Sequence, residues 1–322
     1  MQELIQQLVN GLTWGAIYAL IAVGYTMVYG VLRLINFAHG DVYMVGAMTG
    51  VYTATWFGLV GTTSWLSVVI LLLGAMATCG VLGFLIERIA YKPLRDQPRI
   101  LSLITAIGVS LFLEYGGQQV FGATPQAFPV DILPAVFPGT VDAPVTVGRH
   151  IVFMGDYLRV GQVSVAGVDV LIVLTTLVLM IGLWLIVMKT RTGLALRAVS
   201  FRFDTASLMG ISTNWVISIT FVLGSSLAAV AGILVAFRSP KVEPLMGMMM
   251  GIKAFVAAVL GGIGNIPGAV LGGLLLGMTE VMVAGYFPQG SQWRDGVAFV
   301  SLIGVLLVKP SGLLGKNVVE KV

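Results

Sequence analysis

Long apolar runs with almost no charged residues recur from one end of the chain to the other. A helix needs about 20 apolar residues to cross the hydrocarbon layer of a membrane. Five runs reach that length, and they are residues 8–32, 66–86, 100–121, 167–188 and 213–237. Four weaker runs, shortened or interrupted by glycine and proline, lie near residues 42–60, 250–264, 267–286 and 296–308. Lipid offers no partners to backbone N–H and C=O groups, so the runs are expected to form a bundle of helices.

The composition places the chain among integral membrane proteins. Hydrophobic residues make up 57% of its 322 residues, charged residues only 10%, and the mean hydropathy is +0.98. Soluble domains are about half apolar and about a quarter charged. Only residues 122–166 form a long polar stretch, so residues 1–322 are expected to form a single transmembrane domain. We predict an all-α fold, a polytopic transmembrane helical bundle with some short or broken helices.

The distribution of basic residues predicts the orientation of the chain. The net charge is +4, but Lys and Arg gather in short segments between apolar runs, which indicates membrane topology rather than nucleic-acid binding. Three such segments, residues 88–99, 189–202 and 309–321, are expected on the cytoplasmic side. The run at 42–60 is then either a full crossing or re-entrant. The first alternative gives nine spans and an external N-terminus, and the second gives eight spans and an internal one.

The polar stretch at residues 122–166 is predicted to be an external loop. It contains five prolines, Pro125, Pro129, Pro134, Pro138 and Pro144, which interrupt regular structure. Between Val145 and Val165 the residues alternate in the manner of a half-buried strand. We expect a small β-hairpin there. The single cysteine, Cys79, lies in an apolar run and is expected to pack in the core.

A polar island at residues 189–210 interrupts the apolar runs and has the pattern of an amphipathic helix. Helical periodicity separates an apolar face from a polar one. The apolar face carries Leu194, Ala198, Phe201, Thr205 and Leu208, and the polar face carries Arg197, Ser200, Asp204 and Ser207. A free loop has no need of an apolar face, so the segment is expected to dock onto a partner protein. The alternative is an ordinary basic loop that only fixes the topology.

Polar residues at the edge of the first apolar run are candidates for a translocation path. Asn36, His39 and Asp41 lie there, where polar groups can line a path, gate it or cap helix ends. A catalytic use of His39 and Asp41 would need a nucleophile or metal ligands at suitable spacing, and the sequence offers none. We therefore predict no catalytic residue, no metal site and no cofactor in this chain.

Two carboxylates, Glu114 and Glu280, lie within apolar runs. An ionised carboxylate in lipid costs about 2.5–3.5 kcal/mol, so both should face protein or water. They can serve structural hydrogen bonds, the path or a proton relay, although no intramembrane His or Arg partner is apparent for either. Lys253 is expected near an external helix end, with its ammonium group reaching outward.

Small residues recur at a spacing of four in residues 259–277. Gly264, Gly268 and Gly272 are predicted to let helices approach closely, which is a main source of helix association in lipid. The residues between Gly264 and Gly268 include Pro267 and predict a tight turn or a broken helix. Neither GxGxxG nor GxxxxGKS/T occurs, so the glycines do not indicate a nucleotide site.

Four blocks of sequence carry a family resemblance. They are NGLTWGAIYALIAVGYTMVYG at 10–30, LINFAHGDVYM at 34–44, IERIAYKPLR at 86–95 and KAFVAAVLGGIGNIPGAVLGG at 253–273. Together they resemble the permeases of ABC importers for branched-chain amino acids, specifically those of the LivH type. The resemblance implies a multi-pass protein of the bacterial inner membrane. Its partners would be a second permease subunit, two cytoplasmic ATP-binding subunits and a periplasmic substrate-binding protein.

The resemblance also implies roles for residues. Carried onto this chain, the ATPase-coupling loop comprises Gly193, Leu194, Arg197, Ala198, Asp204, Ala206, Leu208 and Gly210, and the helical pattern adds Phe201. ATP and Mg²⁺ would be used by the partner subunits, so no enzyme activity is expected here. The expected mechanism is alternating access, in which closure of the ATPases pushes the coupling helix. Similar permeases carry urea or short amides, which is one alternative, and an ion-coupled secondary carrier is another.

Overall fold

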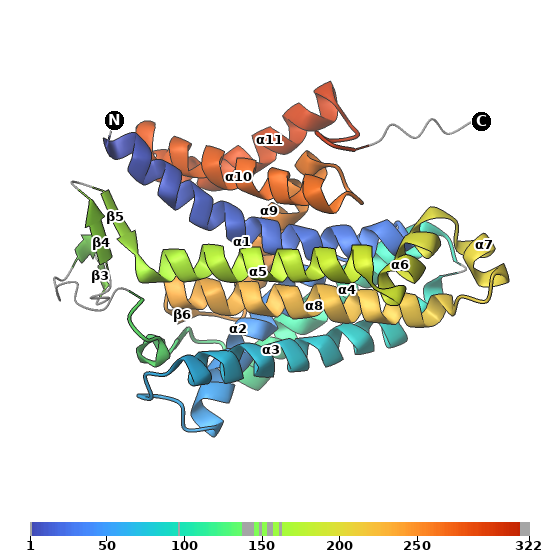
Figure 1. Cartoon of the computed structure of the whole chain (residues 1–322), viewed down its shortest axis with the longest axis horizontal. Helices are drawn as coiled ribbons and strands as arrows, with labels where there is room; N and C mark the ends of the chain where they lie inside the picture. Colours follow the sequence, from blue (N-terminus) through green and yellow to red (C-terminus); the bar gives the residue numbers. More distant parts are fainter. Residues whose placement is uncertain are drawn as a thin grey trace.

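Seven long apolar helices form most of the part of the chain that the structure describes (Figure 1). The computed structural model describes residues 2–95, 97–136, 145–147, 150–152, 157–160 and 163–315. The long helices are α1 (Gln2–Leu32), α3 (Trp65–Ile86), α4 (Arg99–Phe121), α5 (Gly167–Lys189), α8 (Thr213–Arg238), α10 (Ile266–Tyr286) and α11 (Arg294–Val308). Short helices extend two of them, namely η1 (Glu87–Tyr91) and η2 (Lys92–Leu94) after α3 and η4 (Gly290–Trp293) before α11. The predicted all-α transmembrane bundle is confirmed.

Two shorter helices, α2 (His39–Trp56) and α9 (Met246–Gly261), lie inside the bundle. They correspond to two of the four weaker apolar runs, residues 42–60 and 250–264. Every α2 residue from His39 to Met48 is buried, and so is the last part of α9, Val256–Gly261. Where protein rather than lipid surrounds these helices, polar residues such as His39 and Asp41 can be accommodated. A non-helical segment, residues 33–38, leads back into the bundle before α2.

The chain alternates between two ends of the bundle. The loop end, at the left of Figure 1, carries the strands, and the basic end, at the right, carries η1, η2, α6 (Arg191–Phe201), α7 (Phe203–Leu208) and residues 309–315. The Gln6 side chain accepts a hydrogen bond from Ser164 N at 2.8 Å, so α1 starts at the loop end. The described parts of the three basic segments predicted to be cytoplasmic thus share one end. With α2 and α9 counted as passages, the arrangement fits the nine-span alternative.

The first four and last four helices form two halves that run in opposite directions. α1 packs against α10, and in the matching way α8 packs against α3. The halves meet where Gly24 of α1 crosses Gly224 of α8 and where Gly40 of α2 touches Gly247 and Gly251 of α9. Missing side chains let these backbones come into contact, which provides the close packing that holds helices together in lipid. Inverted halves of this kind place the solute site of many transporters between them.

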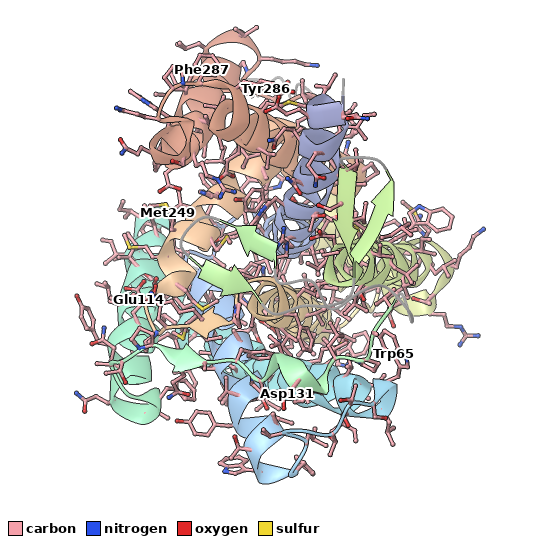
Figure 2. The ribbon with its side chains drawn as sticks, turned by 90° about the vertical axis from the view of Figure 1, so that its left-hand side faces the viewer. Trp65, Glu114, Asp131, Met249, Tyr286 and Phe287 are labelled. Carbon is pink, nitrogen blue, oxygen red and sulfur yellow. The ribbon has the colours of Figure 1, made fainter. Side chains whose placement is uncertain are left out.

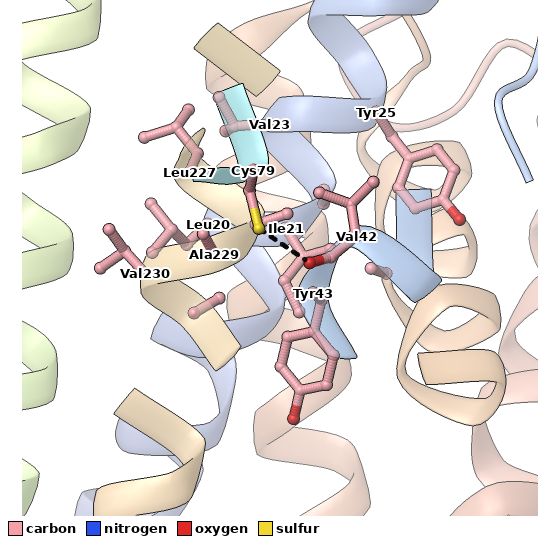
Figure 3. Close-up of a cluster of buried hydrophobic side chains, with 14 of the residues drawn as sticks. Leu20, Ile21, Val23, Tyr25, Val42, Tyr43, Cys79, Leu227, Ala229 and Val230 are labelled. Atoms are coloured by element: carbon pink, nitrogen blue, oxygen red, sulfur yellow. Dashed lines mark hydrogen bonds between the residues drawn. The ribbon is translucent and has the colours of Figure 1, made fainter. Parts of the chain in front are cut away.

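The buried core gathers where α1, α2, α3 and α8 meet (Figure 3). Leu20 of α1, Val42 of α2 and Ala229 of α8 lie around Cys79 of α3. The Cys79 thiol donates a hydrogen bond to the Val42 carbonyl oxygen over 3.5 Å. Cys79 therefore packs in the core, as its place in an apolar run predicted.

The predicted external loop contains two short antiparallel hairpins where one was expected. β2 (Val145–Val147) pairs with β3 (His150–Val152), and β4 (Tyr157–Val160) pairs with β5 (Val163–Ala166). The rest of the predicted hairpin region lies outside the described residues. A third pair, β1 (Gln126–Ala127) with β6 (Lys241–Val242), joins the loop to the segment before α9, and η3 (Val130–Ile132) follows β1.

Candidate functional site

The predicted coupling segment is two helices rather than one. α6 and α7 meet at Arg202, whose φ of −148° and ψ of 109° are extended. The Thr190 hydroxyl caps α6 by accepting a hydrogen bond from Gly193 N at 3.1 Å. Gly210 has a φ of +81° in the turn before α8, a conformation that favours glycine. The prediction of a single helix was wrong because arginine is a good helix former and gives no local signal for a break.

Most of the apolar stripe predicted for this segment faces outward. Leu194 is 62% exposed, Phe201 79% and Leu208 87%. α6 contacts the bundle through other residues, Gly193, Leu196 and Val199. Large apolar side chains gathered on an exposed surface are typical of a site that a partner covers.

Other residues predicted for coupling differ in how they are placed. Arg197 and Asp204 are exposed on the surface, whereas Ala198 is half-buried and Ala206 is buried. Gly193 lies against backbone carbonyl groups near the end of α5, where a side chain would not fit. The predicted set therefore divides into residues that a partner can reach and residues that hold α6 and α7 against the bundle.

A basic hollow of about 1010 Å³ opens beside these helices. Its lining includes the basic side chains Arg33, Lys92, Arg95 and Arg202, contributed by the end of α1, the η2 turn and the break between α6 and α7. Asp204 is the one acid among its lining residues. The positive potential of such a hollow favours a partner surface that carries acidic groups.

A buried ion pair that was not expected from the sequence borders this hollow. Glu87, which follows α3, is fully buried and pairs with Arg95. The Ser218 hydroxyl donates to Glu87 Oε2 at 2.6 Å, and Arg95 donates to Asn214 Oδ1 at 2.5 Å. The pair ties the end of α3 to the start of α8, which directly follows the coupling helices. An acid within a basic segment ordinarily indicates a solvated surface, so the sequence held no signal for this contact.

Asn36 and His39 lie inside the bundle rather than at its mouth. The Asn36 amide oxygen accepts a hydrogen bond from Tyr91 OH at 3.0 Å. The His39 ring packs against Gly24 and stands edge-on to Tyr25, with 4.6 Å between the ring centres. The expected position at the membrane edge was wrong, because the chain turns back inward after α1 ends.

Asp41 of α2 and Glu114 of α4 form a buried carboxyl pair. The two groups lie within hydrogen-bonding reach of each other. Asp41 Oδ2 also accepts a hydrogen bond from the Ser110 hydroxyl at 2.5 Å. The structure thus brings together two of the residues predicted for the path. The pairing depends on how α2 and α4 pack, which the spacing of the residues does not reveal.

Glu280 is the centre of a second buried ionic cluster. Its carboxylate accepts hydrogen bonds from Tyr18 OH at 2.6 Å and Lys253 Nζ at 2.7 Å, and Arg294 Nε lies 3.2 Å away. Lys253 also pairs with Asp295 at 2.7 Å. The expectations that Glu280 has no His or Arg partner and that Lys253 reaches outward were therefore wrong. The cluster connects α1, α9, α10 and α11.

Sequence comparison supplies the family. The family model for the permease component of the branched-chain amino acid transport system matches residues 7–306. The chain belongs to this family. The permease is 42% identical to BraD of Pseudomonas aeruginosa, a high-affinity branched-chain amino acid transport system permease protein, over 99% of this chain and 98% of BraD. It is 41% identical to the LivH protein of Escherichia coli, which carries the same description, over 99% of this chain and 97% of LivH.

A more distant relative is a permease with a different named solute. The galactofuranose transporter permease YtfT of Escherichia coli is 27% identical over 88% of this chain and 75% of YtfT. The much higher identity to the amino acid permeases separates the chain from this relative.

The small-residue block of the permease joins α9 to α10. Gly268 and Gly272 approach the α9 backbone so closely that a side chain would not fit. Gly264 lies instead in the turn, with a φ of +91°. Asn265 Oδ1 caps α10 by accepting a hydrogen bond from Gly268 N at 3.3 Å, and the Asn265 amide donates to Leu314 O at 2.8 Å. Within the described residues of the permease, no group of three His, Cys, Asp or Glu side chains could hold a metal ion.

Proposed function

We propose that this chain is a permease subunit of an ATP-driven importer that carries branched-chain amino acids across the bacterial inner membrane. The observation that carries the proposal is the identity of 41–42% to BraD and LivH over nearly the full length of each. Both relatives are permease proteins of high-affinity branched-chain amino acid transport systems. The permease itself would do no covalent chemistry.

The partners follow from this assignment. We place ATP hydrolysis in two cytoplasmic subunits, and α6 and α7 form the docking site for them on this chain. We also expect a second permease subunit and a periplasmic substrate-binding protein. The exposed side chains of Leu194, Phe201 and Leu208 support this docking site, since nothing in the described chain covers them. The basic hollow beside them supports a partner surface with acidic groups.

The proposed mechanism is alternating access. Closure of the ATPases would push α6 and α7, and the displacement would pass into α8, which begins directly after α7. The Arg95–Asn214 hydrogen bond and the Glu87–Arg95 pair offer a second route, from the start of α8 to α3. The two inverted halves would then tilt against each other across their glycine contacts.

The composition of the purified complex tests the proposed function. The tagged chain would be extracted from its native membrane in a mild detergent, and the proteins that accompany it would be identified by mass spectrometry. We expect a second permease and ATP-binding subunits in fixed ratio. The Phe201→Glu variant changes only the proposed docking site. It should lose the ATP-binding subunits while retaining the second permease. A wild-type chain that purifies alone and takes up solute under an ion gradient would contradict the proposal.

A further inference from the structure

The start of α9 lies near the middle of the bundle's thickness. Gly224, where α8 crosses α1, is eleven residues after Thr213 and fourteen before Arg238. At about 1.5 Å per residue, the crossing is roughly 17 Å and 21 Å from the two ends of α8. The His39 ring packs on α1 at this crossing, and the next residue, Gly40, touches Gly247 in the first turn of α9. The first turn of α9 is therefore at the depth of the hydrocarbon layer.

This helix end is bare on one flank of the molecule. No side chain caps it. Met246 N donates to Glu243 O at 3.1 Å, and the N–H groups that follow in the first turn have no acceptor within the helix. Leu245, Met248 and Met249 are exposed there. Figure 2 shows Met249 on the same flank as Glu114, and we call the surface around these four residues the α4–α9 face. Lipid cannot satisfy the remaining first-turn N–H groups at this depth, so the face must meet protein or water.

The carboxyl pair lies at this face. Asp41 packs against Gly247. Asp41 is 1% exposed and Glu114 5%, and Asp41 Oδ1 and Glu114 Oε1 receive no hydrogen bond from an N–H or hydroxyl group of the described residues. Two carboxyl groups in contact in a low dielectric cannot both stay ionised unless a proton or a cation lies between them. No described Lys or Arg forms an ion pair with either acid.

We propose that the Asp41–Glu114 pair binds the ammonium group of the transported amino acid, and that the α4–α9 face lines the solute path opposite the second permease subunit. This inference rests on the proposed function. An ammonium group brings one positive charge and three hydrogen-bond donors, two of which can go to the two free carboxyl oxygens. The exposed side chains of Met248 and Met249 provide an adaptable apolar surface for a branched aliphatic side chain.

Uptake by the assembled transporter tests the ammonium site. Asp41→Asn and Glu114→Gln would be compared in proteoliposomes supplied with ATP, the binding protein and leucine. Each variant should lower uptake at least about tenfold, the effect of losing one charge-assisted hydrogen bond. Glu3→Gln removes an exposed acid from the start of α1 at the loop end and should keep wild-type uptake. Normal uptake by both pair variants would mean that the two acids only share a proton, and would overturn the proposal.

Thiol labelling tests the face independently of those variants. In a Cys79→Ala background, Met249→Cys should react with a positively charged methanethiosulfonate reagent in the assembled transporter, and leucine with its binding protein should slow the reaction. Leu177→Cys, on the exposed outer side of α5, should not react, because it faces lipid. An unreactive Met249→Cys would overturn the path-lining claim. If the wild-type complex takes up no amino acid, the proposed function fails, and the labelling still decides whether the face meets water.

Discussion

Gly24 of α1 and Gly224 of α8 cross with their backbones in contact at the centre of the bundle. A Cβ atom on Gly224 would lie 3.2 Å from the Gly24 carbonyl oxygen. α1 and α8 are the two most buried of the seven long apolar helices, and they belong to opposite halves. Movement between the halves is therefore expected to centre on this contact.

The first prediction concerns this crossing. Gly24→Ala would place a methyl group against the His39 ring and 3.1 Å from the Gly224 carbonyl oxygen. We expect a loss of stability of about 1–3 kcal/mol, the usual cost of overpacking a close contact. Gly182→Ala in α5 is the control, because nothing lies within 4 Å of its added Cβ. That control should be neutral or more stable by up to about 1 kcal/mol. Thermal unfolding in mild detergent measures both, and equal effects would contradict the prediction.

The second prediction concerns the buried ionic cluster. Glu280→Gln removes the buried acid partner of the Lys253 ammonium group and leaves it only the half-exposed Asp295, and we expect a loss of about 3–5 kcal/mol. Lys253→Gln alone should also destabilise. The double variant should lose clearly less than the sum of the two, because it removes both charges. Unfolding of the four proteins in the same detergent measures this coupling, and strictly additive losses would show that the two groups do not interact.

Run length predicted which segments form the long helices, and charge distribution predicted that the basic segments share one end of the bundle. The apolar runs correspond to α1, α3, α4, α5 and α8 because lipid demands a minimum helix length. Run length and charge distribution could not predict which side chains meet between helices. The Asp41–Glu114 pair and the hydrogen bonds from the Glu87–Arg95 pair to α8 depend on tertiary packing, which leaves no periodic trace in the sequence. The extended backbone at Arg202 likewise has no local cause in propensity.

In the candidate site, too, sequence patterns predicted the exposed residues but not the positions of the buried ones. The pattern that put Leu194, Phe201 and Leu208 on one face predicted surface residues, and all three are exposed. His39 was misplaced, because a polar block after an apolar run ordinarily marks the membrane edge. Here the bundle is wide enough to surround α2 with protein, so a polar segment can re-enter it.

The third prediction concerns docking at the basic end. Phe201→Glu and Leu208→Glu each put a carboxylate into the exposed apolar stripe. Uptake driven by ATP should fall to background, because burying a carboxylate against a partner costs desolvation and the apolar contact that favoured docking is lost. The unfolding temperature should be unchanged, since both positions are exposed. Val60→Glu at the loop end is the control and should keep normal uptake. Uptake that survives in both stripe variants would remove the docking role.

The fourth prediction concerns the turn between α9 and α10. Asn265→Ala removes the cap on Gly268 N and the hydrogen bond to Leu314 O. Loss of a cap costs about 1 kcal/mol, and the lost amide bond adds a similar amount. Asn265→Asp keeps the acceptor and loses only the donor, so it should lie between alanine and wild type. Thermal unfolding ranks the three proteins, and an aspartate variant as unstable as the alanine variant would contradict a capping role.

Uptake in a defined system tests the central claim most directly. The chain would be reconstituted in liposomes with the second permease and the ATP-binding subunits, and labelled leucine would be offered with its binding protein. We predict uptake that requires ATP inside the liposome, stops when the ATP-binding subunits are left out, and does not respond to a proton or sodium gradient. Leucine uptake by the chain alone under an ion gradient, with no effect of ATP, would contradict the account.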